Sequence, residues 1–346
     1  MKKVLFIGYG EPDASSRYRA EQYYDKIKND FPDEFVVDYY KIYPSNIYFQ
    51  KRSRFLLLTI MFFRKLFSLY KCRKFDIIFL QKNTVDILSP LYEMFIRYIL
   101  RKKIIFDFDD SIWILKGKYN RKIKWIIKLS DVVIVGNKFL YDYAIRFNSR
   151  IYVINTVIDT DKYKFNGISE KQKDYVNICW LGSKPNNKYL IEIEDVLVAI
   201  KAKYKTKINF FIVSNERPKF KLFNDYKYLN WSKAIESKVL SESDIGIMPM
   251  TDSEIARGKC GFKLIQYGAY NLVSIASPIG LNNEIIKNSV NGFLVDSEEE
   301  WISKLSYLID NKDVLERMKK RSREMVIFNY SLKANFNHFI DLLEFV

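Results

Sequence analysis

The chain has 346 residues, 48% of them hydrophobic, which allows two domains with packed cores and excludes a disordered protein. Its net charge is +16, and residues 1–165 hold most of it, with 31 Lys and Arg against 18 Asp and Glu. Such a charge favours an anionic partner, either nucleic acid or anionic lipid. One histidine and three widely spaced cysteines exclude a histidine-based metal site and a disulfide framework, and they suit a reducing cytoplasm.

Short apolar runs alternate with helical patterns along the whole chain. The first series predicts strands at residues 4–8, 35–39, 77–80, 104–108, 132–135 and 151–154. A second series predicts strands at residues 176–181, 208–213, 245–248, 273–276 and 293–295. Helices are predicted between them, for example at residues 17–28, 85–100, 188–203 and 298–308. This alternation predicts an α/β protein with two doubly wound parallel sheets.

The two series divide the chain into two expected domains, residues 1–165 and 166–330, with the polar stretch 159–174 as the linker. Residues 331–346 are expected to form a C-terminal helix that packs back on the N-terminal domain. The chain opens on a strand-like run rather than a signal peptide. Its longest apolar run, residues 55–63, is shorter than the roughly 20 residues that cross a bilayer.

Two loops that follow predicted strands are rich in small residues. Ligands bind at the carboxyl ends of strands in such sheets, so we expect both loops to border a site. The first loop contains Gly8, Gly10 and Ser16, and a flexible connection is the alternative. The second has Gly182 and Ser183 before a helix that carries Lys188, where backbone N–H groups suit a phosphate. An ordinary turn with a solvated lysine is the alternative there.

Charged residues gather after two other predicted strands. Arg257, Lys259 and Lys263 follow the strand at 245–248, and the spacing of the two lysines predicts that they share a helix face. Cations that line a cleft beside a helix start suit a pyrophosphate, and a solvated basic helix face is the alternative. Asp107 lies near the end of the strand predicted at 104–108, Asp109 and Asp110 follow that strand, and the three suit either a metal ion or a helix N-cap.

Several longer strings carry a resemblance to a known family. DIGIMPM (244–250), RGKCGFKLIQYGA (257–269), SPIGLNNE (277–284) and NGFLV (291–295) resemble the donor-binding half of GT-B glycosyltransferases, closest to the retaining GT4-like, or group 1, family. Matching strings in the other half are SRYR (16–19), FDFDDSIW (106–113), VGN (135–137) and VIDTDKY (157–163). The resemblance covers nearly the whole chain and is stronger in the second half.

The resemblance implies two Rossmann-like domains that use a UDP- or GDP-sugar and need neither a metal ion nor another cofactor. The N-terminal domain would take the acceptor, and residues 166–330 would bind the donor. The resemblance implies that the leaving diphosphate is held by Lys259 and Lys263, the catalytic cations. It also implies donor contacts from Gly182, Ser183, Lys188, Arg257, Gln266 and Glu284, with Asp110 facing a sugar hydroxyl. Acceptor-side residues would be Gly8, Gly10, Ser16, Arg17 and Arg19.

One position departs from the family. GT4-like enzymes commonly carry two glutamates separated by seven residues, and the chain has Gly258 and Gln266 there. Gln266 can still bond a ribose hydroxyl, whereas Gly258 cannot replace a carboxylate. Asp252 or Glu254 is the alternative for the sugar. Glu284 would contact the donor near a helix start, where a carboxylate that only stabilises the helix dipole is the alternative.

Basic residues surround apolar ones in two parts of the first half. Residues 51–74 hold eight Lys or Arg and no acid around the apolar run, and residues 116–128 hold six Lys or Arg with Tyr119 and Trp125. Such mixtures suit an anionic membrane surface, and a buried helix with a solvated basic face is the alternative. No nucleic-acid-binding motif is present, so nucleic acid is not expected as a partner.

The sequence therefore predicts a cytoplasmic, membrane-peripheral retaining glycosyltransferase of capsule or O-antigen type. It would act on a lipid-linked or surface-polysaccharide acceptor. The alternative from another class is a non-catalytic nucleotide-sugar or glycan-binding partner in a polysaccharide assembly complex, which the missing glutamate motivates. A GT-B epimerase or phosphorylase is a minor alternative.

Overall fold

The computed structural model describes residues 1–10, 13–42, 54–82, 90–115, 118–119, 121–163 and 174–346, and it leaves out the side chains of 54–58, 115, 118 and 119. The chain divides into two compact units. The first unit comprises Met1–Val157, Gly258–Cys260 and Asn335–Val346, and the second comprises Ile158–Arg257 and Gly261–Ala334. The expected domain bounds at 165/166 and 330/331 stay a prediction.

The first unit is built on a six-stranded parallel sheet in the order β2-β1-β3-β4-β7-β8. Its strands are β1(Lys2–Gly8), β2(Phe35–Lys41), β3(Ile77–Gln81), β4(Lys103–Phe108), β7(Val132–Val135) and β8(Ile151–Val153). A short hairpin of β5(Ile114–Leu115) and β6(Lys118–Tyr119) lies outside the sheet. The helices are α1(Ala14–Ser16), η1(Arg17–Glu21), α2(Gln22–Asp30), α4(Arg54–Cys72), α5(Leu91–Met94), η2(Phe95–Ile99), α6(Arg121–Leu129) and α7(Lys138–Ala144).

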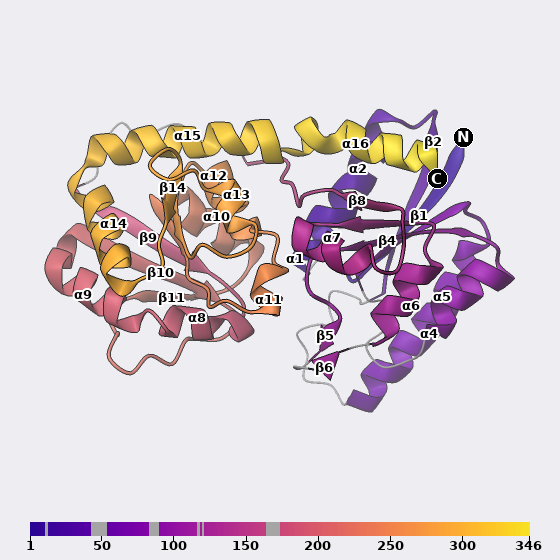
Figure 1. Cartoon of the computed structure of the whole chain (residues 1–346), viewed down its shortest axis with the longest axis horizontal. Helices are drawn as coiled ribbons and strands as arrows, with labels where there is room; N and C mark the ends of the chain where they lie inside the picture. Colours follow the sequence, from indigo (N-terminus) through magenta and orange to yellow (C-terminus); the bar gives the residue numbers. More distant parts are fainter. Residues whose placement is uncertain (11–12, 43–53, 83–89, 116–117, 120, 164–173) are drawn as a thin grey trace. The chain divides into compact units, whose positions relative to one another are not determined.

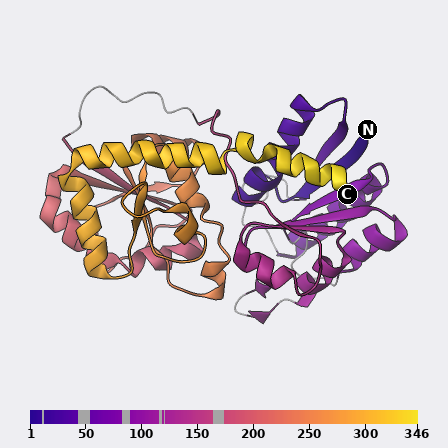
Figure 2. The ribbon, with the colours of Figure 1, turned by 45° about the horizontal axis from the view of Figure 1, so that its top comes forward.

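The second unit has its own six-stranded parallel sheet, in the order β11-β10-β9-β12-β13-β14. Its strands are β9(Val176–Leu181), β10(Ile208–Ser214), β11(Lys227–Asn230), β12(Ile245–Met248), β13(Val273–Ala276) and β14(Gly292–Leu294). Its helices are η3(Lys184–Asn186), α8(Asn187–Ile191), α9(Glu194–Tyr204), η4(Lys205–Lys207), α10(Lys233–Glu242), α11(Glu254–Arg257), α12(Phe262–Ala269), α13(Asn282–Ile285), α14(Glu298–Asp310) and α15(Lys312–Tyr330). Helices lie on both sides of each sheet (Figure 1, Figure 2).

The central strands are continuous Val, Ile, Leu and Phe runs because both of their faces are covered by helices. Val4–Ile7 and Val132–Val135 are buried along their whole length. In the second unit, Trp301 and Leu305 of α14 and Leu197 of α9 close the core over the sheet. Some helices begin at a residue whose side chain caps them, such as Ser297, whose Oγ accepts a hydrogen bond from the Glu300 N–H.

The C-terminal helix α16(Leu332–Phe345) supplies aromatic side chains to the first unit. The rings of Phe336 and Phe339 stack on Tyr23 of α2, with centroids 6.2 and 4.2 Å away. Phe339 also contacts Phe6 and Phe79, in the middle of the sheet. Residues from the end of the chain therefore complete the core built by its beginning.

The predicted fold class and all eleven predicted strands are confirmed, to within two residues at each end. The edge strand β11 was missed because its sequence, KYLN, has no buried apolar run. The prediction of a single helix at 188–203 is wrong, because this stretch forms two helices, α8 and α9. The predicted linker 159–174 and the basic clusters at 51–74 and 116–128 fall partly outside the described residues. No helix among those described is long and apolar enough to span a bilayer.

Candidate functional site

Each sheet has one place where the strand order reverses direction. In the first unit this switch lies between β1 and β3, and in the second it lies between β9 and β12. Loops at the carboxyl ends of these strands diverge and leave room for a ligand. The sequence-predicted residues Gly8, Gly10 and Ser16 follow β1, and Gly182 and Ser183 follow β9.

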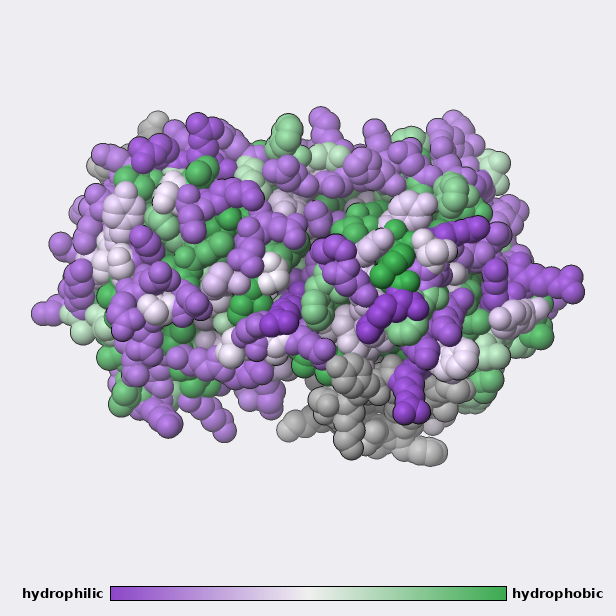
Figure 3. Space-filling model, in the orientation of Figure 1, coloured by the Kyte–Doolittle hydropathy of each residue, from purple (hydrophilic) through white to green (hydrophobic). Residues whose placement is uncertain are grey.

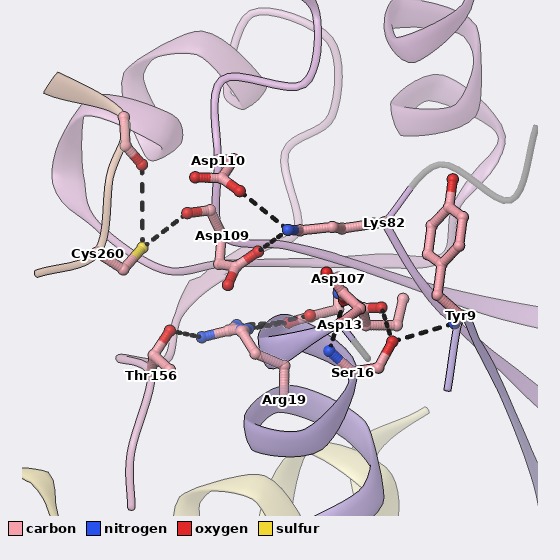
Figure 4. Close-up of polar contacts among 12 residues, drawn as sticks. Tyr9, Asp13, Ser16, Arg19, Lys82, Asp107, Asp109, Asp110, Thr156 and Cys260 are labelled. Carbon is pink, nitrogen blue, oxygen red and sulfur yellow. Dashed lines mark hydrogen bonds and ion pairs between the residues drawn. The ribbon is translucent and has the colours of Figure 1, made fainter. Parts of the chain in front are cut away.

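A buried ion pair stands at the carboxyl edge of the first sheet (Figure 4). The Nε of Arg19 lies 3.0 Å from both carboxylate oxygens of Asp107, at the end of β4, and its Nη2 bonds the same carboxylate. Its Nη1 donates to the carbonyl of Ile154 at 2.7 Å and to Thr156 Oγ1. Burial lowers the pKa of Arg19, but the attraction of Asp107 outweighs it and raises the pKa. Arg19 therefore ties η1 to β4 and the chain after β8.

Ser16 organises the loop after β1. Its Oγ accepts from the Tyr9 N–H and donates to Gln81 Oε1, both at 3.0 Å, and its own N–H donates to Asp13 Oδ2 at 2.8 Å. Gly8 has no room for a side chain, because a Cβ would overlap the hydroxyl of Tyr39. Gly10 has φ of +103°, in the region that favours glycine. The guanidinium of Arg17 lies 5.1 Å from the ring centroid of Tyr18.

Lys82, directly after β3, was not predicted from the sequence. Its backbone is left-handed, with φ of +56°, a strained conformation for a lysine. Its Nζ donates to Asp110 Oδ2 at 2.9 Å and lies 3.3 Å from Asp109 Oδ1 (Figure 4). Burial lowers the pKa of Lys82, but Asp109 and Asp110 outweigh it and raise the pKa. The sequence does place a lysine shortly after one predicted strand and two aspartates directly after the next, and this pattern could have indicated the cluster.

The two aspartates that contact Lys82 differ in the direction of their pKa shifts and in their exposure. Burial raises the pKa of Asp109, but Lys82 and Arg19 outweigh it, so that the pKa falls below 3.8. Burial dominates at Asp110 and raises its pKa above the same value. The side chain of Asp110 nevertheless keeps 48% of its surface exposed, against 10% for Asp109. Asp110 is thus the carboxylate of this pair that a ligand can reach.

The short segment Gly258–Cys260 belongs to the first unit. Cys260 Sγ donates to the carbonyl of Asp109 at 3.1 Å, and Asn137 Nδ2 donates to the carbonyl of Lys259 at 3.1 Å. A Cβ on Gly258 would overlap Ser111 Oγ, so the position of the customary glutamate has no room for a side chain. The charge of Lys259 is felt by Asp110, whose pKa it lowers against the larger effect of burial.

The expectation that Lys259 and Lys263 share a helix face is wrong. Helix α11 ends at Arg257 and α12 begins at Phe262, so Lys259 lies in the loop between them. The reason is Gly261, which is left-handed with φ of +58° and breaks the helical path just before α12. Lys263 alone lies on α12.

In the second unit, Trp180 brings Gly182 and Lys263 together. A Cβ on Gly182 would overlap the Trp180 ring, so the indole lies directly against this glycine. The Nζ of Lys263 lies 5.3 Å from the centre of the same ring, within the range of a cation–π interaction. Ser183 Oγ accepts from Asn186 Nδ2 at 3.0 Å, and Lys188 lies over Tyr189 on the exposed side of α8.

Arg257 and Gln266 have partners within the second unit. Arg257 Nε donates to Asp252 Oδ1 at 2.8 Å, and both side chains are half exposed. This bond raises the pKa of Arg257 and lowers that of Asp252. Gln266 is buried and its Nε2 donates to Glu236 Oε1 at 3.0 Å, while Glu236 Oε2 accepts from Trp231 Nε1 at 2.6 Å.

Other predicted residues lie apart from these contacts. Glu284 is exposed on α13. Its charge adds to burial in raising the pKa of Tyr330 to about 12. Glu236 and Trp231, which the sequence reasoning missed, follow the weakly patterned strand β11. In the described part of the chain, no three His, Cys, Asp or Glu side chains are grouped to hold a metal ion.

The comparisons with known proteins agree with this architecture. Residues 176–311 match the model of the family described as glycosyl transferases group 1. No curated protein is matched by the sequence. Among solved structures, a glycosyltransferase from Rickettsia africae ESF-5 is similar at 15% identity and a TM-score of 0.69, with 99% of this chain and 97% of that chain covered.

Two further solved structures are similar over the full chain. Sucrose-phosphate synthase from Thermosynechococcus elongatus has a TM-score of 0.71 at 13% identity, with 99% of this chain and 98% of that chain covered. HepE from Anabaena, in complex with UDP-glucose, has a TM-score of 0.72 at 12% identity, with both chains fully covered. At such identities the likeness concerns the fold. The chain therefore has the GT-B fold, and its residues 176–311 match the family of group 1 glycosyl transferases.

Proposed function

We propose that the protein transfers a sugar from a UDP- or GDP-sugar to a hydroxyl of a lipid-linked or surface-polysaccharide acceptor. The transfer retains the anomeric configuration, needs no metal ion and takes place at the cytoplasmic face of a membrane. One observation carries the donor half of this proposal, namely the ammonium group of Lys263 on the Trp180 ring beside Gly182, at the switch point of the second sheet.

A nucleotide diphosphate suits that place for electrostatic reasons. The indole of Trp180 fills the side-chain position of Gly182, and Lys263 brings a positive charge beside it. Arg257 adds a second cation from α11, and its exposed bond to Asp252 exchanges readily for a phosphate. That HepE was solved with UDP and with UDP-glucose supports UDP as the nucleotide here.

The reaction breaks the bond between the anomeric carbon and the β-phosphate oxygen. A new bond forms from the same carbon, on the same face, to the acceptor oxygen. The acceptor proton passes to the leaving phosphate, so that no separate protein base is required. Lys263, together with Arg257, stabilises the negative charge that develops on the diphosphate. This division of labour fits a chain with one histidine.

The first unit offers a place for the acceptor hydroxyl. Asp110 is the exposed member of the Lys82–Asp109–Asp110 cluster, and its carboxylate can accept a hydroxyl hydrogen bond while Lys82 holds it in place. Arg19 and Ser16 take positioning roles, because their polar atoms are bonded inside the unit. The surplus of 31 basic over 18 acidic residues in the first 165 supports an anionic membrane nearby.

Titration calorimetry with UDP and GDP, in the presence of EDTA, tests the donor half. We expect UDP or GDP to bind, Lys263→Ala to bind at least 10-fold more weakly, and turnover of the cognate sugar nucleotide to fall at least 100-fold. Lys304→Ala is the matched control, since Lys304 makes the same kind of contact, 5.2 Å from the Phe293 ring centre. If neither nucleotide binds, or if Lys263→Ala binds as tightly as the control, the proposal is wrong.

A second candidate is a non-catalytic nucleotide-sugar or glycan-binding partner of a polysaccharide assembly complex. The observation that favours it is that a Cβ on Gly258 would overlap Ser111 Oγ, which leaves no space for a carboxylate at that position. The two candidates differ in one measurement. Tight nucleotide binding with neither sugar transfer to a lipid extract nor donor hydrolysis would select the second candidate.

A further inference from the structure

Helix α4 buries polar side chains and exposes its large apolar ones. Lys65, Ser68 and Cys72 are buried against the first unit, where Ser68 Oγ lies 2.7 Å from the hydroxyl of Tyr92. The large apolar side chains are on the opposite side, between 48% and 62% exposed: Phe62, Phe63, Leu66, Phe67 and Tyr70. A surface helix in water normally buries its apolar stripe. The exposed face of α4 therefore suits contact with an apolar environment.

The neighbouring helical segment has the same property. Ile96 is the buried residue of η2, whereas exposed apolar side chains occupy its outer side and that of α5: Leu91, Met94, Phe95, Tyr98 and Ile99. In the space-filling view, green apolar residues lie among purple ones along this side of the first unit (Figure 3). These ten large apolar side chains on the adjacent elements α4, α5 and η2 form a patch, which scattered surface residues would not.

A groove of about 640 Å³ runs between the two elements. Leu66 and Tyr70 of α4 line it on one side, and Phe95 and Ile99 of η2 line it on the other. Arg73 and Lys102 are also among its lining residues. A groove of this volume that combines apolar walls with two cations suits an apolar chain attached to an anionic group.

The charge around the groove decides between possible occupants. Residues 54–103 hold eleven Lys or Arg and three Asp or Glu, and one of those acids, Glu93, is buried. A second copy of the chain would bring an equal positive charge against this face, which disfavours self-association. Nucleic acid would match the charge but not the apolar walls. An anionic lipid matches both.

We propose that the face formed by α4, α5 and η2 docks on an anionic lipid bilayer, with a lipid chain in the groove and lipid phosphates against Arg73 and Lys102. The inference rests on the membrane association in the proposed function and assigns it to one surface. Tyr70 and Tyr98 are amphipathic rings that suit the headgroup level, while Leu66 and Ile99 reach the acyl region.

Co-sedimentation with vesicles tests this surface. We expect the full chain to bind vesicles of phosphatidylcholine with 30% phosphatidylglycerol, and to bind pure phosphatidylcholine at least 10-fold more weakly. Leu66→Ser/Ile99→Ser and Arg73→Gln/Lys102→Gln should each weaken binding to the anionic vesicles at least 5-fold. All four side chains are at least partly exposed, so the fold should persist. Phe328→Ser, at an 80% exposed phenylalanine of α15, is the matched control and should bind as the wild type does.

Thiol labelling gives an independent readout. The three native cysteines are buried, so an introduced Ile99→Cys should dominate the reaction with a maleimide. We expect anionic vesicles to slow that reaction several-fold and to leave a Phe328→Cys control unchanged.

The outcomes separate this inference from the rest of the proposed function. Wild-type binding that both double variants retain would overturn the assigned surface and leave membrane association standing. Absence of wild-type binding to any vesicle would overturn both. Concentration-dependent dimers that these variants abolish, without vesicle binding, would show that a second copy covers the face. UDP affinity, measured on the same variants, should remain unchanged and tests the donor site separately.

Discussion

The carboxyl edges of the two sheets use charge in different ways. At the first edge, Arg19 and Asp107 are buried together, and Lys82 is shared between Asp109 and Asp110. At the second edge, Lys263 lies on an indole ring and Arg257 on an exposed aspartate. Buried ion pairs hold their side chains in a fixed geometry, whereas cations near the surface remain available to an incoming anion. This difference supports the proposal that the first edge holds a neutral hydroxyl and the second edge holds a diphosphate.

The largest expected effect on stability comes from breaking the buried pair of the first edge. Arg19→Met leaves the Asp107 carboxylate buried without its partner, which should lower the free energy of unfolding by about 3–5 kcal/mol. Arg19→Met/Asp107→Leu removes both charges and should recover most of that loss. Urea denaturation of the three proteins measures the difference. A single variant as stable as the wild type would show that the pair does not organise this edge.

A smaller effect, with a pH signature, is expected for Lys82→Met. Lys82 holds the pKa of Asp109 below 3.8, so its stabilisation is present above about pH 4 and is lost as the pH falls through the folded pKa. The variant should be less stable by about 1–3 kcal/mol at pH 7 and should approach the wild type as the pH falls below the folded pKa of Asp109. Chemical denaturation across this range provides the measurement. A difference that does not change with pH would contradict the electrostatic role.

The smallest effect on stability is expected at the second edge. Arg257→Gln removes an exposed ion pair, and the unfolding midpoint should not change measurably. UDP should nevertheless bind several-fold more weakly to this variant, because a cation near the diphosphate is lost. Asp252→Asn is the control, since it removes the same ion pair and keeps the guanidinium. A lower unfolding midpoint for Arg257→Gln, or unchanged UDP affinity, would contradict the proposed difference between the two edges.

The sheets could be predicted from the sequence because parallel strands covered on both faces are continuous apolar runs, as in residues 132–135. The position of Lys259 could not, because it depends on the left-handed turn at Gly261. Lys82 was missed because its importance arises from Asp109 and Asp110, which reach it only when β3 and β4 pair. The orientation of α4 could not be predicted either, since periodicity shows that two faces of a helix differ and does not show which one is buried.

The contact between Trp180 and Lys263 also provides an optical signal. An indole emits at a wavelength that depends on the electric field across its ring, and the ammonium group 5.3 Å away is a large source of that field. An anion that draws Lys263 away or neutralises its charge will shift the emission of Trp180. Four other tryptophans contribute a background, which Trp180→Phe identifies by subtraction. The protein can thus report the occupancy of its second edge without any added label.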